Sequence, residues 1–199
     1  MRLKAIPEAE MGSTYPKAWR YLSRFESELR HSGIFRRYFK SSNPFYSIFN
    51  IGDYTFCHYK VLTREIAGSL TSAVVGRRDG KPCIPDHKLI MVGCDGLMEA
   101  NFLCAALNSS PARLFVDSYV IKTQFSTHIF DLLAIPPYSE GNKTHTRLAE
   151  LSEAAHKAAA KGNSAEVKRI EEEIDGWAAK LWNLSDKELA EMKRALEEM

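Results

Sequence analysis

Residues 88–111 read KLIMVGCDGLMEANFLCAALNSSP, a short apolar run followed by a longer apolar segment. The run over 88–92 has the length and composition of a strand. Asp95 is a good N-cap for a helix over 97–108, which Ser109-Ser110-Pro111 ends. The apolar face of this helix consists of Phe102, Leu103, Ala106 and Leu107. The stretch therefore predicts a strand followed by a buried helix.

The neighbouring segments predict further strands. An apolar run over 70–75 precedes an exposed loop over 76–86 that is rich in glycine, proline and charge. Aromatic and β-branched residues over 45–62, broken at Gly52-Asp53, predict two strands joined by a tight turn. Two more strands are expected, over 114–120 and 127–135. Strands interspersed with helices predict an α+β fold with a mixed sheet.

An amphipathic helix is expected near the N-terminus, ending near Gly33. Pro16 suits the first helical position, and apolar residues then recur at helical spacing. They are Trp19, Leu22, Phe25 and Leu29. Residues 17–40 carry seven basic and two acidic side chains, so a polyanion is expected to meet this surface first. A solvated helix face is the alternative interpretation.

The segment after Tyr138 predicts a helical hairpin and a short third helix. A break at Gly162-Asn163 separates the two arms, and a heptad seam follows it. The seam consists of Val167, Ile170, Ile174, Trp177, Leu181 and Leu184. A capping-box spacing starts the third helix near Asp186. We expect two domains, a body over 1–140 and a helical tail over 141–199 that packs on it.

Composition and charge narrow the function. The 199 residues are 45% apolar and 26% charged, which is typical of a globular chain and excludes a disordered one. No apolar run is long enough for a membrane span or a signal peptide, so we expect a cytoplasmic protein without membrane contact. Residues 1–145 hold 18 basic and 13 acidic side chains, and residues 146–199 hold nine and 12. The body is basic and the tail acidic.

No complete catalytic or metal-binding motif occurs. The four cysteines and six histidines lack the spacing of a metal site or a catalytic pair, so no metal and no catalytic residue is expected. Asn43-Pro44-Phe45-Tyr46 and Ile135-Pro136-Pro137-Tyr138 each match only part of the motif by which amino-methyltransferases hold a target amine. A glycine-rich turn for a nucleotide-like cofactor is also absent.

Basic and polar residues on loops and helices remain as candidates for DNA contact. For phosphate contacts we predict Arg20, Arg24, Arg36, Arg37, Lys60 and Arg64. For groove contacts we predict Arg77, Arg78, Lys81, Lys122, Gln124 and Ser126, and we add Asn43 after the basic helix.

Several stretches, taken in order from about residue 15 to the end, carry a family resemblance. They are Tyr15-Pro16-Lys17-Ala18-Trp19-Arg20-Tyr21-Leu22, Phe45-Tyr46-Ser47-Ile48-Phe49-Asn50-Ile51-Gly52, Tyr59-Lys60-Val61, Asp86-His87-Lys88, Leu107-Asn108-Ser109, Ile135-Pro136-Pro137 and Leu181-Trp182-Asn183-Leu184-Ser185-Asp186-Lys187-Glu188-Leu189. Together they resemble the C-terminal specificity domain of TaqI-like N6-adenine DNA methyltransferases and of the related type IIG restriction-modification enzymes.

This resemblance implies a target-recognition domain that grips double-stranded DNA and reads its site. A catalytic domain in cis, or a separate subunit, would bind S-adenosylmethionine and methylate the flipped adenine, so no cofactor is expected in this chain. The base-reading loops vary most in such families, so the contact residues above rest on their chemistry alone. Two alternatives stay open: a standalone S-adenosylmethionine-dependent enzyme that uses Asn43-Pro44-Phe45-Tyr46, and a protein-interaction adaptor that uses the tail.

Overall fold

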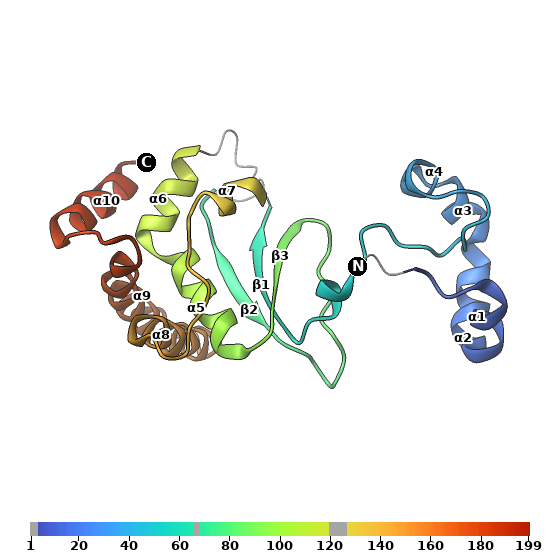
Figure 1. Cartoon of the computed structure of the whole chain (residues 1–199), viewed down its shortest axis with the longest axis horizontal. Helices are drawn as coiled ribbons and strands as arrows, with labels where there is room; N and C mark the ends of the chain where they lie inside the picture. Colours follow the sequence, from blue (N-terminus) through green and yellow to red (C-terminus); the bar gives the residue numbers. More distant parts are fainter. Residues whose placement is uncertain (1–3, 66–67, 120–126) are drawn as a thin grey trace. The chain divides into compact units, whose positions relative to one another are not determined.

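The computed structural model describes residues 4–65, 68–119 and 127–199. Within these residues, helices and a three-stranded sheet make up an α+β fold, which confirms the predicted α+β class (Figure 1). The sheet is antiparallel and not mixed as predicted, because both of its strand pairings are antiparallel. The chain divides into two compact units, Met1–Thr55 and Phe56–Met199. In the part of the chain that is described, no helix is long and apolar enough to cross a membrane.

Short helices make up much of the first unit. They are α1 (Glu8–Thr14), α2 (Pro16–Leu22), η1 (Ser23–Phe25), α3 (Glu26–His31) and α4 (Gly33–Tyr38). Pro16 starts α2 as predicted, but helical structure continues past the predicted end at Gly33. The continuation arises because Ser32 caps α4, its Oγ accepting a hydrogen bond from the Phe35 backbone N–H at 3.2 Å.

The first of the two strands predicted over 45–62 is wrong. The Phe45 side chain is buried, and its ring centroid lies 5.7 Å from that of Trp19. The Tyr46 hydroxyl donates to the Ile6 carbonyl at 2.7 Å. These residues therefore anchor turns against the helices, and a single turn of 3-10 helix, η2 (Asp53–Phe56), precedes the second strand.

The sheet of the second unit has the order β2-β1-β3. Its strands are β1 (Tyr59–Arg64), β2 (Ser72–Val75) and β3 (Leu89–Cys94), and both pairings are antiparallel. Val61 in the central strand lies opposite Val74 on one side and Val92 on the other. Because side chains alternate along a strand, these three valines share the face that packs on α5.

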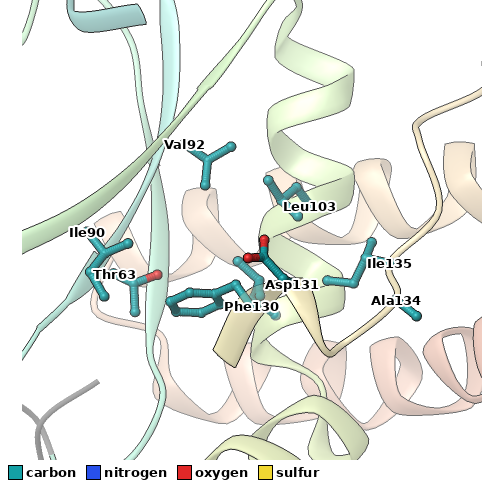
Figure 2. Close-up of a pocket in the computed structure, with 9 residues that line it drawn as sticks. Thr63, Ile90, Val92, Leu103, Phe130, Asp131, Ala134 and Ile135 are labelled. Atoms are coloured by element: carbon teal, nitrogen blue, oxygen red, sulfur yellow. The ribbon is translucent and has the colours of Figure 1, made fainter. Parts of the chain in front are cut away.

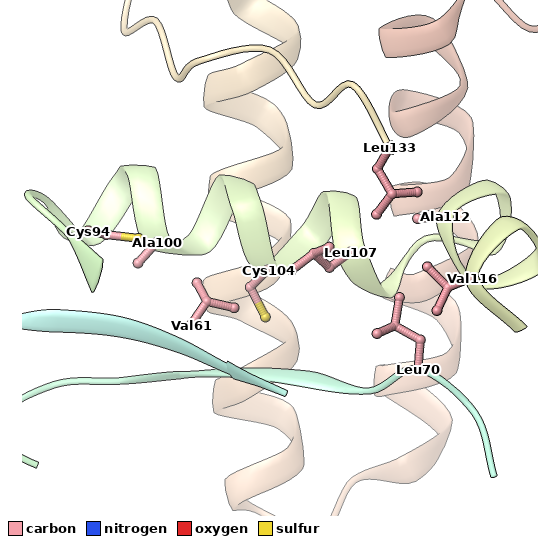
Figure 3. Packing of buried hydrophobic residues seen from close by; sticks show 9 residues of the cluster. All are labelled: Val61, Leu70, Cys94, Ala100, Cys104, Leu107, Ala112, Val116 and Leu133. Carbon is pink, nitrogen blue, oxygen red and sulfur yellow. The ribbon is translucent and has the colours of Figure 1, made fainter. Parts of the chain in front are cut away.

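Helix α5 (Leu97–Asn108) covers that face of the sheet, as residues 88–111 predict. Figure 3 shows Val61 of β1 pointing toward the side of the helix that carries Ala100 and Cys104. The predicted N-cap is one residue off, because Gly96 takes the cap position without a side-chain hydrogen bond. The Asp95 backbone N–H donates instead to Glu99 Oε2 at 2.8 Å.

The strands predicted over 114–120 and 127–135 are wrong, because the described residues there form helices over 114–119 and 127–131, followed by a turn and an irregular segment. Helix α6 (Ser110–Tyr119) buries Ala112 and Val116, four residues apart, so its apolar period is helical. Its first residue is fixed by the carboxylate of Asp175, which accepts from both the Ser110 backbone N–H and Oγ at 2.7 Å.

Helix α7 (Thr127–Asp131) replaces the second predicted strand. The backbone N–H groups of Leu132 and Leu133 bond back to the carbonyls of Ile129 and Phe130, which removes them from strand pairing. Trp182 Nε1 donates to the Leu133 carbonyl at 2.8 Å and ties the segment after α7 to the C-terminal helices.

The C-terminal hairpin and third helix form as predicted. They are α8 (Lys143–Ala160), α9 (Ser164–Ala178), the short η3 (Ala179–Trp182) and α10 (Asp186–Glu198). Asn163 caps α9 at the predicted break, and Ser185 and Glu188 form a complete capping box. Ile170 and Ile174 of the seam are buried in a cluster with Phe102 of α5 and Leu148 of α8.

The hairpin therefore uses its apolar seam to pack on α5 (Figure 1). The boundary expected at residue 140 falls inside the second compact unit. The division into a body domain before residue 140 and a tail domain after it stays a prediction.

Side chains of two helices close the β2 edge of the sheet. The Asn108 carboxamide accepts from the Ser72 N–H at 2.8 Å and donates to the Ser72 carbonyl at 2.9 Å, as a neighbouring strand does. His156 Nε2 accepts from the Val74 N–H at 3.0 Å. A closed edge cannot pair with another chain.

Candidate nucleic-acid interface

A two-residue turn presents basic side chains at the tip of the β2–β3 connection. Arg78 and Lys81 exchange two backbone hydrogen bonds of 3.0 and 2.9 Å. Between them Asp79 and Gly80 both have positive φ, 49° and 73°, which defines the tight turn that suits β-hairpins. Arg77, Arg78 and Lys81 are all exposed, as predicted for the 76–86 loop.

The first unit carries a second group of exposed cations. Arg20 lies in the last turn of α2 and Arg24 in η1, and both are exposed. Arg36 and Arg37 lie in the last turn of α4 and are exposed too. The Arg37 guanidinium lies 5.3 Å from the centroid of the Tyr38 ring, which orients it without neutralising it.

The arginines divide into two classes by their partners. In the C-terminal helices Arg147 pairs with Glu150 and Glu173, Arg169 with Glu166, and Arg194 with Glu191. Hydrogen bonds that the Arg147 guanidinium donates to Glu173 and Glu150 raise its pKa. Among the described residues, no carboxylate lies within ion-pairing distance of Arg20, Arg24, Arg36, Arg37, Arg64, Arg77 or Arg78. Their charge is free to meet an external anion.

Arg30 belongs to the basic segment but has a structural role that the sequence reasoning missed. It bonds to Glu26 at 2.8 Å and Glu8 at 3.2 Å, and it donates to the carbonyl of Ser41. Its guanidinium also lies 5.6 Å from the Phe45 ring centroid. Glu26 lies four residues before Arg30, the favoured order for a helical ion pair, whereas the unpaired Arg24 lies four residues before Glu28 in the less favourable order.

Lys60 is not placed for the predicted phosphate contact. It is 1% exposed, and its Nζ donates to the Cys57 carbonyl at 2.6 Å. A strand position that points into the protein removes its ammonium from the surface. Arg64, four residues further along β1, is exposed at the strand's end.

The Asn43 side chain makes a hydrogen bond within the first unit. Its Oδ1 accepts from the Lys40 backbone N–H at 2.8 Å and closes the turn that follows α4. With Phe45 buried and Tyr46 bonded to Ile6, the segment that partly matches the amine-holding motif serves the packing of the first unit. Lys122, Gln124 and Ser126 lie outside the described residues.

Two of the four cysteines are buried. Burial raises the pKa of the Cys94 thiol to about 12 and that of Cys104 to about 11, so both stay protonated and unreactive at neutral pH. In the described ranges, no group of three or more His, Cys, Asp or Glu side chains is arranged to hold a metal ion.

A curated protein shares sequence with this chain. Over 107 residues the chain is 33% identical to the type II methyltransferase M.NspV of Nostoc sp.. The similarity covers 53% of this chain and 21% of that protein, so the chain spans about a fifth of its relative. No protein-family model matches the chain. The chain therefore contains a region related to a type II methyltransferase.

Proposed function

We propose that this chain is the DNA target-recognition domain of an adenine-specific methyltransferase or restriction-modification enzyme. It grips double-stranded DNA and reads its site for a catalytic domain on the same polypeptide or on a separate subunit. That catalytic domain binds S-adenosylmethionine and methylates a flipped adenine. The similarity to M.NspV supports the methyltransferase context, and the resemblance to TaqI-like specificity domains supports the reading role.

The observation that carries the proposal is the set of exposed arginines that have no carboxylate partner among the described residues. Unpaired cations repel one another, and phosphates remove that repulsion while releasing condensed counterions. The acidic C-terminal helices pair their own arginines and so have little to offer a phosphate. DNA is therefore expected to meet the first unit and the sheet of the second, and not the tail.

The turn at Asp79-Gly80 suits the reading step. A two-residue turn makes a narrow tip, and the major groove, about 12 Å wide, admits a two-stranded ribbon. Arginine pairs bidentately with guanine in that groove. Arg77 and Arg78 are therefore assigned to base edges, with Lys81 beside them. Arg20, Arg24, Arg36, Arg37 and Arg64 are assigned to phosphates.

Fluorescence anisotropy with duplex DNA over a salt series tests the grip. Each lost phosphate contact lowers the slope of log affinity against log salt by about 0.9, so Arg36→Ala/Arg37→Ala is expected to lower it by up to about 1.8. Lys168→Ala/Arg169→Ala in α9 removes the same charge from the tail and is the matched control. Equal slopes for the two double variants contradict the proposal.

The reading step needs a separate measurement. Selection from a random duplex pool first yields the preferred site. Arg77→Ala/Arg78→Ala is then expected to lose about 1–3 kcal/mol of preference for that site per base pair contacted, with a smaller loss on unrelated DNA. An equal loss on both DNAs assigns these residues to phosphates.

Isothermal titration with S-adenosylmethionine tests the standalone-enzyme alternative. The recognition role predicts no binding to this chain. Saturable binding that Asn43→Ala abolishes supports the alternative instead.

A further inference from the structure

The two edges of the sheet differ. Ser72 and Val74 point their backbone N–H groups away from β1, toward Asn108 and His156. Their partners in β1 are Thr63 and Val61, which therefore bond to β3 at Ile90 and Val92. The intervening residues of β3, Met91 and Gly93, must direct their N–H and C=O groups outward. Among the described residues, no group hydrogen-bonds to these outward atoms.

A pocket of about 270 Å³ lies beside this open edge. Ile90 and Val92 of β3 form one wall, Leu103 and Leu107 of α5 another, and Phe130 and Ile135 a third. Val92 is 40% exposed although its neighbours on this face of the sheet are covered. The pocket is therefore apolar and open, and it lies on the side of the sheet that α5 covers.

The carboxylate of Asp131 lines this pocket. Figure 2 shows the Asp131 side chain directed from α7 between Phe130 and Leu103. Asp131 is exposed, and no hydrogen bond or ion pair joins it to another described residue. A cationic group that enters the pocket mouth would find its charge complement there.

We propose that the β3 edge binds an extended segment of another protein as a fourth strand. Met91 and Gly93 supply the backbone hydrogen bonds, as in β-strand addition. Alternate side chains of the added strand face α5. One apolar side chain fills the pocket, and a Lys or Arg two residues away in the segment pairs with Asp131. The partner is thus a peptide with an apolar and a basic residue at positions i and i+2.

A pool of blocked heptapeptides tests the partner's chemistry. The probe is acetyl-Thr-Z-Thr-Z-Thr-Z-Thr-amide, in which Z is Leu, Val, Phe, Lys or Glu, captured on the full chain and identified by mass spectrometry. The expected result is enrichment of peptides that carry one apolar residue and one Lys at neighbouring Z positions. Recovery of a pool with its starting composition overturns the proposal.

A charge swap makes the test specific. Asp131 is exposed, so Asp131→Lys is expected to fold. It should weaken binding of the selected Lys peptide by about tenfold or more and favour the Glu-for-Lys version. Asp86→Lys, another exposed carboxylate near the start of β3, is the control and leaves both affinities unchanged. An unchanged Lys-peptide affinity in Asp131→Lys contradicts the assignment.

Hydrogen exchange locates the added strand. The Met91 and Gly93 amides are expected to exchange quickly in the free chain and to become protected by the selected peptide, while Ser72 and Val74 stay protected throughout. Slow exchange at Met91 in the free, dilute chain means that the edge is already covered and refutes the proposal. Protection that grows with protein concentration alone means that a second copy occupies the edge, which also refutes it.

Discussion

At the scale of the residue, the Asn108 side chain makes the hydrogen bonds that a neighbouring strand would make at the β2 edge. Its carboxamide satisfies both backbone groups of Ser72, and Cys104 Sγ adds a weaker contact to the Ser72 carbonyl. The arrangement depends on an amide, because only an amide offers a donor and an acceptor at this spacing. No pattern in the sequence separates Asn108 from an ordinary residue at a helix end.

Asn108→Ala is therefore expected to destabilise the chain by about 2 kcal/mol, since it leaves the Ser72 N–H without its partner at a buried site. Urea unfolding followed by circular dichroism measures the change. Asn101→Ala is the control, because the Asn101 side chain is buried on the same helix, where Asn108 is half-buried, but bonds only to the carbonyl of Leu97. An equal loss in both variants would mean that edge closure adds nothing.

His145 makes stability depend on pH. Burial lowers the pKa of its imidazole, and its Nδ1 accepts a hydrogen bond from the Ser139 N–H at 3.1 Å. The native imidazole therefore takes up a proton only at a lower pH than the unfolded chain, which does so below about pH 6.5. Because the unfolded state binds more protons, acidification favours unfolding.

The expected result is a free energy of unfolding that declines as the pH falls below about 6.5, by up to about 1.4 kcal/mol per pH unit from this group. His145→Gln retains an acceptor for Ser139 and should flatten the profile. The measurement is a series of urea titrations between about pH 5 and 7.5. His87→Gln, at an exposed imidazole, is the control and should keep the original slope. If His145→Gln also keeps it, the prediction is wrong.

At the scale of the element, the Asp79-Gly80 turn sets the geometry of the basic tip. Both residues adopt left-handed conformations that glycine tolerates and most side chains do not. A methyl group at Gly80 would meet no neighbour, so the cost of Gly80→Ala is conformational alone.

We expect Gly80→Ala to cost about 1 kcal/mol of stability and to blur the preference for the DNA site, because the register of Arg78 and Lys81 is lost. Unfolding titrations and competition between preferred and unrelated duplexes measure the two effects. Gly68→Ala, at an exposed position without positive φ, is the matched control. Unchanged discrimination between the duplexes in Gly80→Ala would remove the turn from the reading step.

The elements that the sequence predicts correctly are those whose pattern is local. Each of these elements has a capping residue, an apolar period or a helix-ending residue within its own sequence. They are the strand predicted over 88–92, the helix over 97–108 and the capped C-terminal helices. The failures are short apolar segments whose partners lie elsewhere in the chain. The sequence over 114–120 reads equally well as a strand, and the helix over 110–119 depends on Asp175, far along the chain.

The candidate site shows the same difference between local patterns, which the sequence reveals, and long-range contacts, which it does not. Charge and loop composition identify the exposed arginines, because neither depends on long-range contacts. They do not separate Lys60 from its neighbours, since its burial follows from the sheet register. Nor do they identify Asp131, whose significance comes from the walls that α5 and β3 place around it.

At the scale of the whole molecule, the two groups of unpaired arginines belong to different compact units. Arg36 and Arg37 lie in the first unit, and Arg77 and Arg78 in the second. When two groups of side chains share no interaction partner, the binding free energy lost on substituting one group is expected not to depend on the other group.

Combining Arg36→Ala/Arg37→Ala with Arg77→Ala/Arg78→Ala should therefore give the sum of the two separate losses, within about 0.5 kcal/mol. Anisotropy titrations at one salt concentration measure the DNA affinity of the unchanged chain, the two double variants and the quadruple variant. A quadruple variant that loses no more than the worse double variant would show that the two units do not contact one DNA molecule together.

The unequal edges of the sheet also limit how copies of this chain can associate. Asn108 and His156 seal β2, so a second molecule can join only at β3. Two molecules joined there would each present a sealed edge to the solvent. Growth would stop at a pair, because a filament needs a free edge at both ends of every unit. The helices that bury the core thus also protect the chain against fibre formation.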